Sequence, residues 1–159
     1  PDAPFPCDMA AVGFQWFSLA DRDPQAILKG VDHIAPALSE WIDSLQKEYG
    51  LGDAQTVLMG FSQGAMMSLY VGTRRSTPVA GIMAYSGALV AEPGNTKPPI
   101  LLVHGRVDPV VPFAAFETAK EALDRAAFDV TPLAIDDLPH GIDQTGVEEG
   151  GRFLTRVLG

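Results

Sequence analysis

The stretch Gly60-Phe61-Ser62-Gln63-Gly64 constrains this chain more than any other, because it fits G-x-S-x-G in a specific local context. The apolar residues 56–59 precede it and predict a buried parallel strand. Residues 65–70 follow it and predict a helix. A strand, a sharp turn and a helix in this order form a strained turn that exposes a serine hydroxyl at the end of a sheet. The motif therefore predicts a local fold and marks Ser62 as a candidate nucleophile.

Helical and strand patterns alternate along the rest of the chain. Apolar residues at three- and four-residue spacing predict a helix from Pro24, with Asp23 as its N-cap, to about Tyr49. Pro36 lies inside that pattern and predicts a kink. Further strands are predicted at residues 79–85, 100–103 and 130–135, and further helices at residues 113–127 and 144–158. This order predicts one α/β domain over residues 1–159, with a mostly parallel sheet covered by helices on both faces.

Two segments carry more local expectations. Pro132 stands inside the last predicted strand, which favours an edge of the sheet or a bulge. Residues 1–23 contain three prolines and no sustained periodicity, so they predict an ordered loop. Trp16 and Phe17 are expected to help anchor this loop.

Composition excludes several classes of partner. The net charge of -9 argues against nucleic acid and against anionic membrane surfaces. No apolar run approaches the roughly 18–20 residues that a membrane span requires. The single cysteine, Cys7, excludes an internal disulfide, and the three histidines lack the spacing of metal ligands. We therefore expect no metal site, and because no signal peptide is visible we expect a cytoplasmic protein.

A serine nucleophile needs a base and an orienting acid, which in this architecture gather at the carboxyl ends of strands. Asp108 follows the strand predicted at residues 100–103, and His140 follows the one at residues 130–135. The three residues occur in the chain order serine, acid, histidine, which is the order expected when the serine lies in such a turn. In isolation, however, Asp108 is as well explained as a turn residue before Pro109.

The other acids and histidines fit less well. Asp136 and Asp137 also follow a strand, but they lie too close in sequence to His140 to hold it from the far side. His33 falls within the first helix, before the nucleophile. His104 ends a strand, where it is expected to shape the Asp108 loop by hydrogen bonding.

The turn also predicts a site for a developing oxyanion. The backbone N–H of Gln63 opens the following helix, where anions are stabilised. Glycine is expected to be required at positions 60 and 64, because strand and helix approach closely beside the strained serine and leave no room for a Cβ atom.

Together these features resemble the phospholipase/carboxylesterase family of α/β-hydrolases, which includes acyl-protein thioesterases. Residues 60–64 are similar to its G-F-S-Q-G turn, and residues 104–112 to its H-G-x-x-D-x-x-V-P acid loop. Trp16-Phe17 is similar to its W-F/Y pair, and the likeness runs over essentially the whole chain. The resemblance implies an α/β-hydrolase fold with Ser62 as nucleophile, Asp108 as acid and His140 as base. It also implies hydrolysis of carboxylic esters or thioesters without a cofactor.

Two departures from the family pattern stand out. Glycine usually precedes the family's catalytic histidine, whereas here Pro139 precedes His140 and Gly141 follows it. The family also has early strands, one ending in a His-Gly-rich loop that donates a second oxyanion N–H, and nothing here matches them. With those strands missing before Pro1, the strand at residues 56–61 is expected to be an open edge. We therefore expect the upstream segment to be a retained fragment, a disordered segment, or replaced by a partner strand in a homodimer.

These observations predict a serine carboxylesterase acting on a small-molecule ester or thioester. Lysophospholipase and acyl-protein thioesterase are alternative activities, and a non-catalytic fragment that only binds a partner is the alternative of another class. Trp16 and Phe17 are candidate substrate-binding residues, with a core role at least as well supported.

Overall fold

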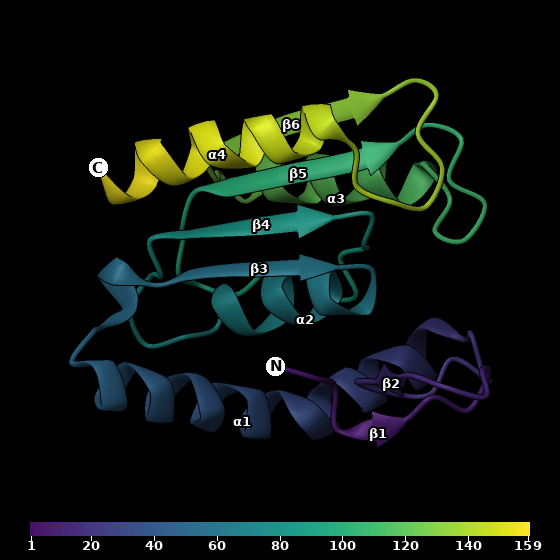
Figure 1. Ribbon diagram of the computed structural model, residues 1–159, viewed down its shortest axis with the longest axis horizontal. Helices are drawn as coiled ribbons and strands as arrows, with labels where there is room; N and C mark the ends of the chain where they lie inside the picture. The colour runs from purple at the N-terminus through teal and green to yellow at the C-terminus, as the bar shows by residue number, and fades with distance from the viewer.

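A parallel four-stranded sheet forms the centre of the computed structural model, which describes residues 1–159 (Figure 1). The strands lie in sequence order and are β3 (Val57–Phe61), β4 (Gly81–Tyr85), β5 (Ile100–Gly105) and β6 (Val130–Ile135). Each strand pairs in parallel with the next, so each connection crosses over the sheet. The predicted α/β architecture is confirmed.

Helices cover both faces of this sheet, as the alternation of its side chains requires. On β4, Ile82 and Ala84 pack against α2 (Gln63–Gly72) and α3 (Ala114–Arg125). Met83 and Tyr85 point to the opposite face and contact the cluster that contains Phe153 of α4 (Gln144–Leu158). Every residue of β4 and β5 is buried, so these strands hold the carboxyl end of the sheet rigidly.

The long helix α1 (Pro24–Tyr49) packs on α2 and lies beyond the β3 edge of the sheet (Figure 1). The Asp23 carboxylate accepts hydrogen bonds from the Gln25 and Ala26 N–H groups at its start. Gly50, with a φ of 66°, ends it in the left-handed conformation that glycine tolerates best. The helix runs through Pro36 without interruption.

The N-terminal segment differs from the expected loop in one respect. Residues Phe5–Pro6 (β1) and Phe14–Gln15 (β2) pair as a short antiparallel ladder. Two-residue strands are too short to produce a readable alternation, which is why the sequence predicted a loop. Phe17 anchors the segment, because its ring is only 4% exposed within the core between α1 and α2.

The two outer strands of the sheet differ in character. The β6 edge carries Pro132, as predicted, and its pairing with β5 runs without a bulge from Val130 to Ile135. The β3 edge carries the exposed apolar side chains of Met59 and Phe61, which are 59% and 38% exposed. Because β3 pairs only with β4, its outer N–H and C=O groups are free to pair with another strand.

We expect this edge to make the purified chain associate as protein concentration rises. Met59→Lys places a charge on the open edge and should shift the mass measured by multi-angle light scattering toward the monomer. Val147→Lys, which removes an exposed valine on α4, is the matched control and should leave the mass unchanged. A wild-type chain that is already monomeric at all concentrations would contradict this expectation.

Candidate active site

Ser62 occupies a strained turn between β3 and α2. Its φ of 54° and ψ of -118° place a non-glycine residue in a sparsely populated conformation. The surroundings hold it there, because the Ser62 N–H donates to the Tyr85 carbonyl at 2.9 Å and its own carbonyl accepts from Ala65 and Met66. Ser62 occupies the N-cap position of α2, but its side chain makes no capping hydrogen bond to the helix. Its hydroxyl is therefore available to other partners.

The two flanking glycines are not equivalent. A Cβ built on Gly60 would lie 2.1 Å from the backbone carbon and oxygen of Gly64, so any side chain there would force strand and helix apart. A Cβ on Gly64 would meet nothing within 4 Å. The close approach predicted for this turn therefore rests on Gly60 alone.

The structure brings Ser62, His140 and Asp108 into one hydrogen-bonded series. His140 Nε2 lies 3.1 Å from Ser62 Oγ, and His140 Nδ1 lies 2.8 Å from Asp108 Oδ2. The three residues follow β3, β6 and β5 at the carboxyl edge of the sheet. The imidazole stands between hydroxyl and carboxylate, in the arrangement that lets a serine lose its proton to a histidine.

Asp108 is fully enclosed, and its side chain is 0% exposed. Its Oδ1 accepts hydrogen bonds from the N–H groups of Val110 and Val111 at 2.8 and 2.9 Å. Burial by itself raises the pKa of Asp108, but the hydrogen bonds from His140, Val111 and Val110 outweigh it, and the net pKa is lowered. The carboxylate thus stays ionised and oriented toward His140.

This lowered pKa makes the stability of the fold depend on Asp108 in acid. A group with a lower pKa in the folded state stabilises it above the unfolded pKa of about 3.9, and that contribution is lost as pH falls through the folded value. Urea unfolding of wild type and Asp108→Asn should therefore give free energies that converge as the pH falls below about 3.9. A difference that stays constant over this range would show that the carboxylate is not stabilised by folding.

The loop that carries His140 is supported by residues that the sequence did not single out. Gly105 ends β5 so close to this loop that a Cβ there would lie 1.9 Å from the Leu138 carbonyl oxygen. The Ser86 hydroxyl donates to the Gly141 carbonyl at 3.2 Å, and the Phe61 ring lies 4.7 Å from the His140 ring. Pro139 therefore does not prevent the histidine from reaching Ser62. The position of Gly105 at the end of a strand was the only sequence signal for this support.

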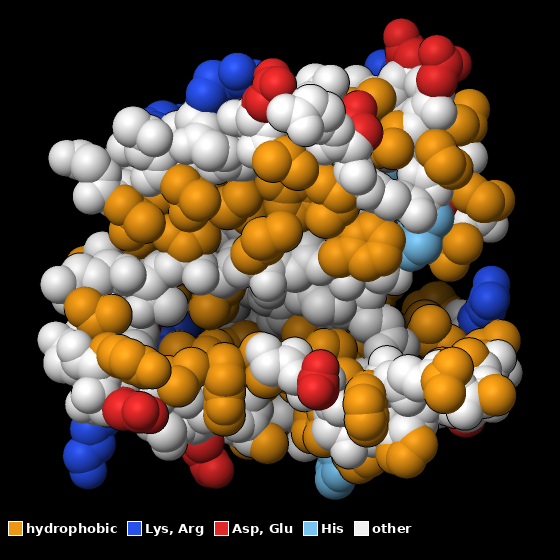
Figure 2. Space-filling view, viewed as in Figure 1, with side chains coloured by type: hydrophobic (Ala, Val, Ile, Leu, Met, Phe, Trp, Pro, Cys, Tyr) orange, Lys and Arg blue, Asp and Glu red, His pale blue; other side chains and the backbone are white.

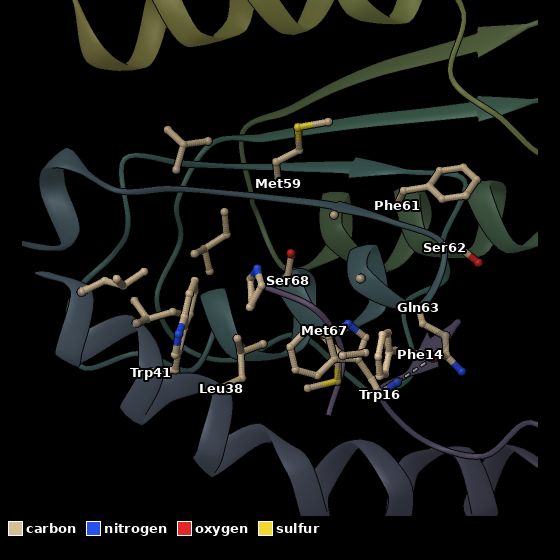
Figure 3. A pocket seen from close by; sticks show the side chains of 18 of the residues that line it. Phe14, Trp16, Leu38, Trp41, Met59, Phe61, Ser62, Gln63, Met67 and Ser68 are labelled. Atoms are coloured by element: carbon tan, nitrogen blue, oxygen red, sulfur yellow. Dashed lines mark hydrogen bonds between the residues drawn. The ribbon is translucent and has the colours of Figure 1, made fainter. Parts of the chain in front are cut away.

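A cavity of about 960 Å³ opens beside Ser62 and runs between β3 and α1. Figure 2 shows hydrophobic side chains along both sides of the corresponding hollow. Leu38 and Trp41 project from α1 toward β3, and Trp16 lies nearer to Ser62 (Figure 3). Phe17 is absent from the cavity wall because its ring is turned into the core. Of the two aromatic residues expected to contact substrate, the structure places only Trp16 beside the cavity.

Gln63 connects the turn at Ser62 to the N-terminal segment (Figure 3). Its backbone N–H opens α2, where no intrahelical acceptor exists. Its side-chain Oε1 accepts from the Trp16 N–H, and its Nε2 donates to the Phe17 carbonyl, both at 2.9 Å. The side-chain amide of Gln63 thus pairs with the backbone of the N-terminal segment through one donor and one acceptor, and these two hydrogen bonds hold Trp16 beside the cavity.

We expect Gln63→Glu to loosen this connection, because a carboxylate cannot donate to the Phe17 carbonyl. The loss of this partly buried hydrogen bond should cost about 1 kcal/mol in the free energy of unfolding and should speed proteolysis within residues 1–20. Gln55→Glu is the control, since Gln55 uses only its side-chain oxygen, which accepts from Gly52. Equal behaviour of the two variants would show that the Gln63 amide does not hold the segment.

The remaining candidates make no hydrogen bond to Ser62 or His140. Asp136 is 85% exposed and pairs with Arg106 at 2.9 Å, and His33 is exposed on α1. His104 is buried at the end of β5 and is absent from the cavity wall. No group of three or more His, Cys, Asp or Glu side chains is arranged to hold a metal ion. None of the helices combines the length and apolar character needed to cross a membrane.

Sequence comparison relates nearly the whole chain to known proteins. Residues 1–158 match the model of a family described as Phospholipase/Carboxylesterase. Esterase YpfH of Escherichia coli strain K12 is 36% identical over 138 residues, which cover 86% of this chain and 60% of that protein. Acyl-protein thioesterase 1 of Aspergillus fumigatus is 28% identical over 152 residues, covering 89% and 61% of the two chains. The chain thus spans about three fifths of the length of these relatives.

Solved structures show the same relationship. The crystal structure of esterase PE8 superimposes with a TM-score of 0.94 at 39% identity, covering 99% of this chain and 77% of that one. The crystal structure of Arabidopsis thaliana SOBER1 gives a TM-score of 0.79 at 24% identity, covering 100% and 82%, and supports the fold alone. Both matches place the four-stranded sheet and its helices in an α/β-hydrolase fold.

Proposed function

The chain belongs to the phospholipase/carboxylesterase family, and from this premise we propose that it hydrolyses carboxylic esters through a covalent acyl-enzyme. One observation carries the proposal: Ser62 Oγ, His140 and Asp108 form a continuous hydrogen-bonded series beside a large apolar cavity.

Each of the three residues has a defined part in the proposed reaction. Ser62 Oγ attacks the acyl carbonyl while His140 Nε2 takes the hydroxyl proton. The His140 imidazolium then returns this proton to the departing alcohol, and the acyl group remains on Ser62. Asp108 Oδ2 accepts the Nδ1–H of His140, which fixes the tautomer and stabilises the imidazolium. A water activated by the same histidine releases the acid and restores the serine.

The backbone N–H of Gln63 is the proposed donor to the tetrahedral oxyanion. It lies at the start of α2, next to the nucleophile, where the unpaired N–H groups of the helix favour negative charge. One such donor in a water-poor site stabilises the transition state by about 3–4 kcal/mol.

The cavity favours substrates with an apolar acyl group. Its wall combines the indole rings of Trp16 and Trp41 with aliphatic side chains such as Leu38. An acyl chain entering it would bury apolar surface at about 25 cal/mol per Å². The 28% identity to an acyl-protein thioesterase supports thioesters as a second substrate class.

Acyl-enzyme trapping tests the proposal. We expect p-nitrophenyl esters to give a burst of nitrophenol equal to the enzyme concentration, with the mass of one acyl group added to the chain. A panel of esters and thioesters of increasing acyl length would then separate carboxylesterase, lysophospholipase and thioesterase activities. Turnover without any covalent adduct would contradict the proposed mechanism. Absence of both burst and turnover would favour the alternative that the chain only binds a partner.

A further inference from the structure

His104 lies beside Asp108 but is not a member of the proposed triad. It stands near the end of β5, is 1% exposed and does not line the cavity. Its ring is enclosed by the rings of Phe113 and Phe116, with centroids 6.2 and 6.1 Å away. A polar ring this deeply buried needs a hydrogen-bond partner, and the partner shows what the residue does.

The partner is a carbonyl on the far side of the acid loop. His104 Nε2 lies 2.9 Å from the Val111 carbonyl oxygen. A carbonyl has no proton to give, so Nε2 must carry the hydrogen and donate it. This bond joins the end of β5 to the residues just before α3, and it closes the loop that carries Asp108.

Val111 connects this bond to the Asp108 carboxylate. Its N–H donates to Asp108 Oδ1 at 2.9 Å, while its C=O accepts from His104. His104 Nε2 also lies 3.5 Å from Asp108 Oδ2, the oxygen that accepts from His140. The His104 imidazole therefore holds the loop that orients Oδ1, and its Nε2 also lies close to the oxygen that accepts from His140.

We propose that His104 is a positioning residue, which acts through Val111 to hold the Asp108 carboxylate in the orientation that His140 requires. The proposal rests on the proposed hydrolytic function. Without the Nε2–H donor, the Val111 carbonyl is left unpaired, the loop relaxes and the carboxylate turns away from the Nδ1–H of His140. Because His104 does not line the cavity, the effect should fall on kcat and not on KM.

Variants of His104 separate this role from a purely structural one. His104→Leu removes the donor at similar volume, and His104→Phe removes it while keeping an aromatic ring. His104→Gln keeps an N–H donor at a similar distance from the backbone. His33→Leu, on the exposed surface of α1, is the matched control. A fluorophosphonate probe counts the assembled sites in each sample, and kcat is then expressed per labelled site.

We expect His104→Leu and His104→Phe to lower kcat per labelled site by about 10- to 100-fold, with KM within about twofold of wild type. His104→Gln should recover most of the loss, and His33→Leu should match wild type. The proposal is overturned if the donor-free variants keep wild-type kcat, or if His104→Gln is no better than His104→Leu. Failure of the proposed function has a separate signature, since wild type itself would neither label nor turn over, and the role of His104 would fall with it.

Discussion

Replacing Ser62 by alanine is expected to lower kcat for ester hydrolysis by about 10⁴- to 10⁶-fold while the fold stays intact. The physical reason is that the variant loses the proposed nucleophile, whereas the cavity and the Gln63 N–H remain. His140→Ala should lose a similar factor, because the hydroxyl then has no base at 3.1 Å. Initial rates with p-nitrophenyl acetate, measured on variants with wild-type circular dichroism, check both expectations.

Substitution of Asp108 is expected to lower the rate as well. Asp108→Asn should cost about 10⁴-fold in kcat, since an asparagine that donates to Nδ1 holds His140 in the wrong tautomer. Combining Asp108→Asn with Ser62→Ala should lower the rate no further than Ser62→Ala alone, because the three residues act as one unit. Asp136→Asn is the matched control on an exposed strand-end aspartate and should keep wild-type activity. Wild-type rates in Ser62→Ala would remove the serine from the mechanism.

Gly60→Ala is expected to destabilise the fold strongly, although it adds only one methyl group. Its Cβ would lie 2.1 Å from Gly64 backbone atoms, which have no flexible side chain to move away. Strand β3 and helix α2 must separate to relieve this overlap, so we expect a loss of at least about 4 kcal/mol, comparable to the whole stability of a small domain. Urea unfolding or, failing soluble protein, the soluble fraction on expression measures the effect.

Gly64→Ala is the control for this change, because the same added methyl group would meet nothing within 4 Å. It should be neutral or slightly stabilising, since alanine has the higher helix propensity within α2. If both variants unfold alike, the close approach at the turn does not explain the requirement for glycine.

The main elements of the fold were predictable because their sequence patterns are long and regular. The buried runs that became β4 and β5 are apolar on both faces, as strands between helices must be. The amphipathic pattern and the Asp23 N-cap of α1 also marked its start and its end near Tyr49. The short β1–β2 ladder was missed, because pairing over two residues depends on tertiary contacts and leaves no periodic signal.

The meeting of the candidate site residues was predictable from the sequence, but the contacts that support them were not. The order of Ser62, Asp108 and His140 after successive strands is enough to expect them together at one edge of the sheet. The hydrogen bond of Ser86 joins residues 55 positions apart, and that from the Trp16 N–H to the Gln63 side chain joins residues 47 positions apart. No local sequence pattern predicts either bond. For Phe17, a tryptophan-phenylalanine pair does not reveal which ring turns to the cavity and which to the core.

Labelling with a fluorophosphonate probe, followed by peptide mapping in a mass spectrometer, tests the central claim most directly. Such a probe reacts quickly only with a serine whose proton is removed by a neighbouring base. We predict one adduct per chain, located on Ser62, formed in wild type and absent or strongly slowed in His140→Ala and in urea-unfolded protein. An adduct on another residue, or labelling of Ser62 at the same rate with and without His140, would contradict the account.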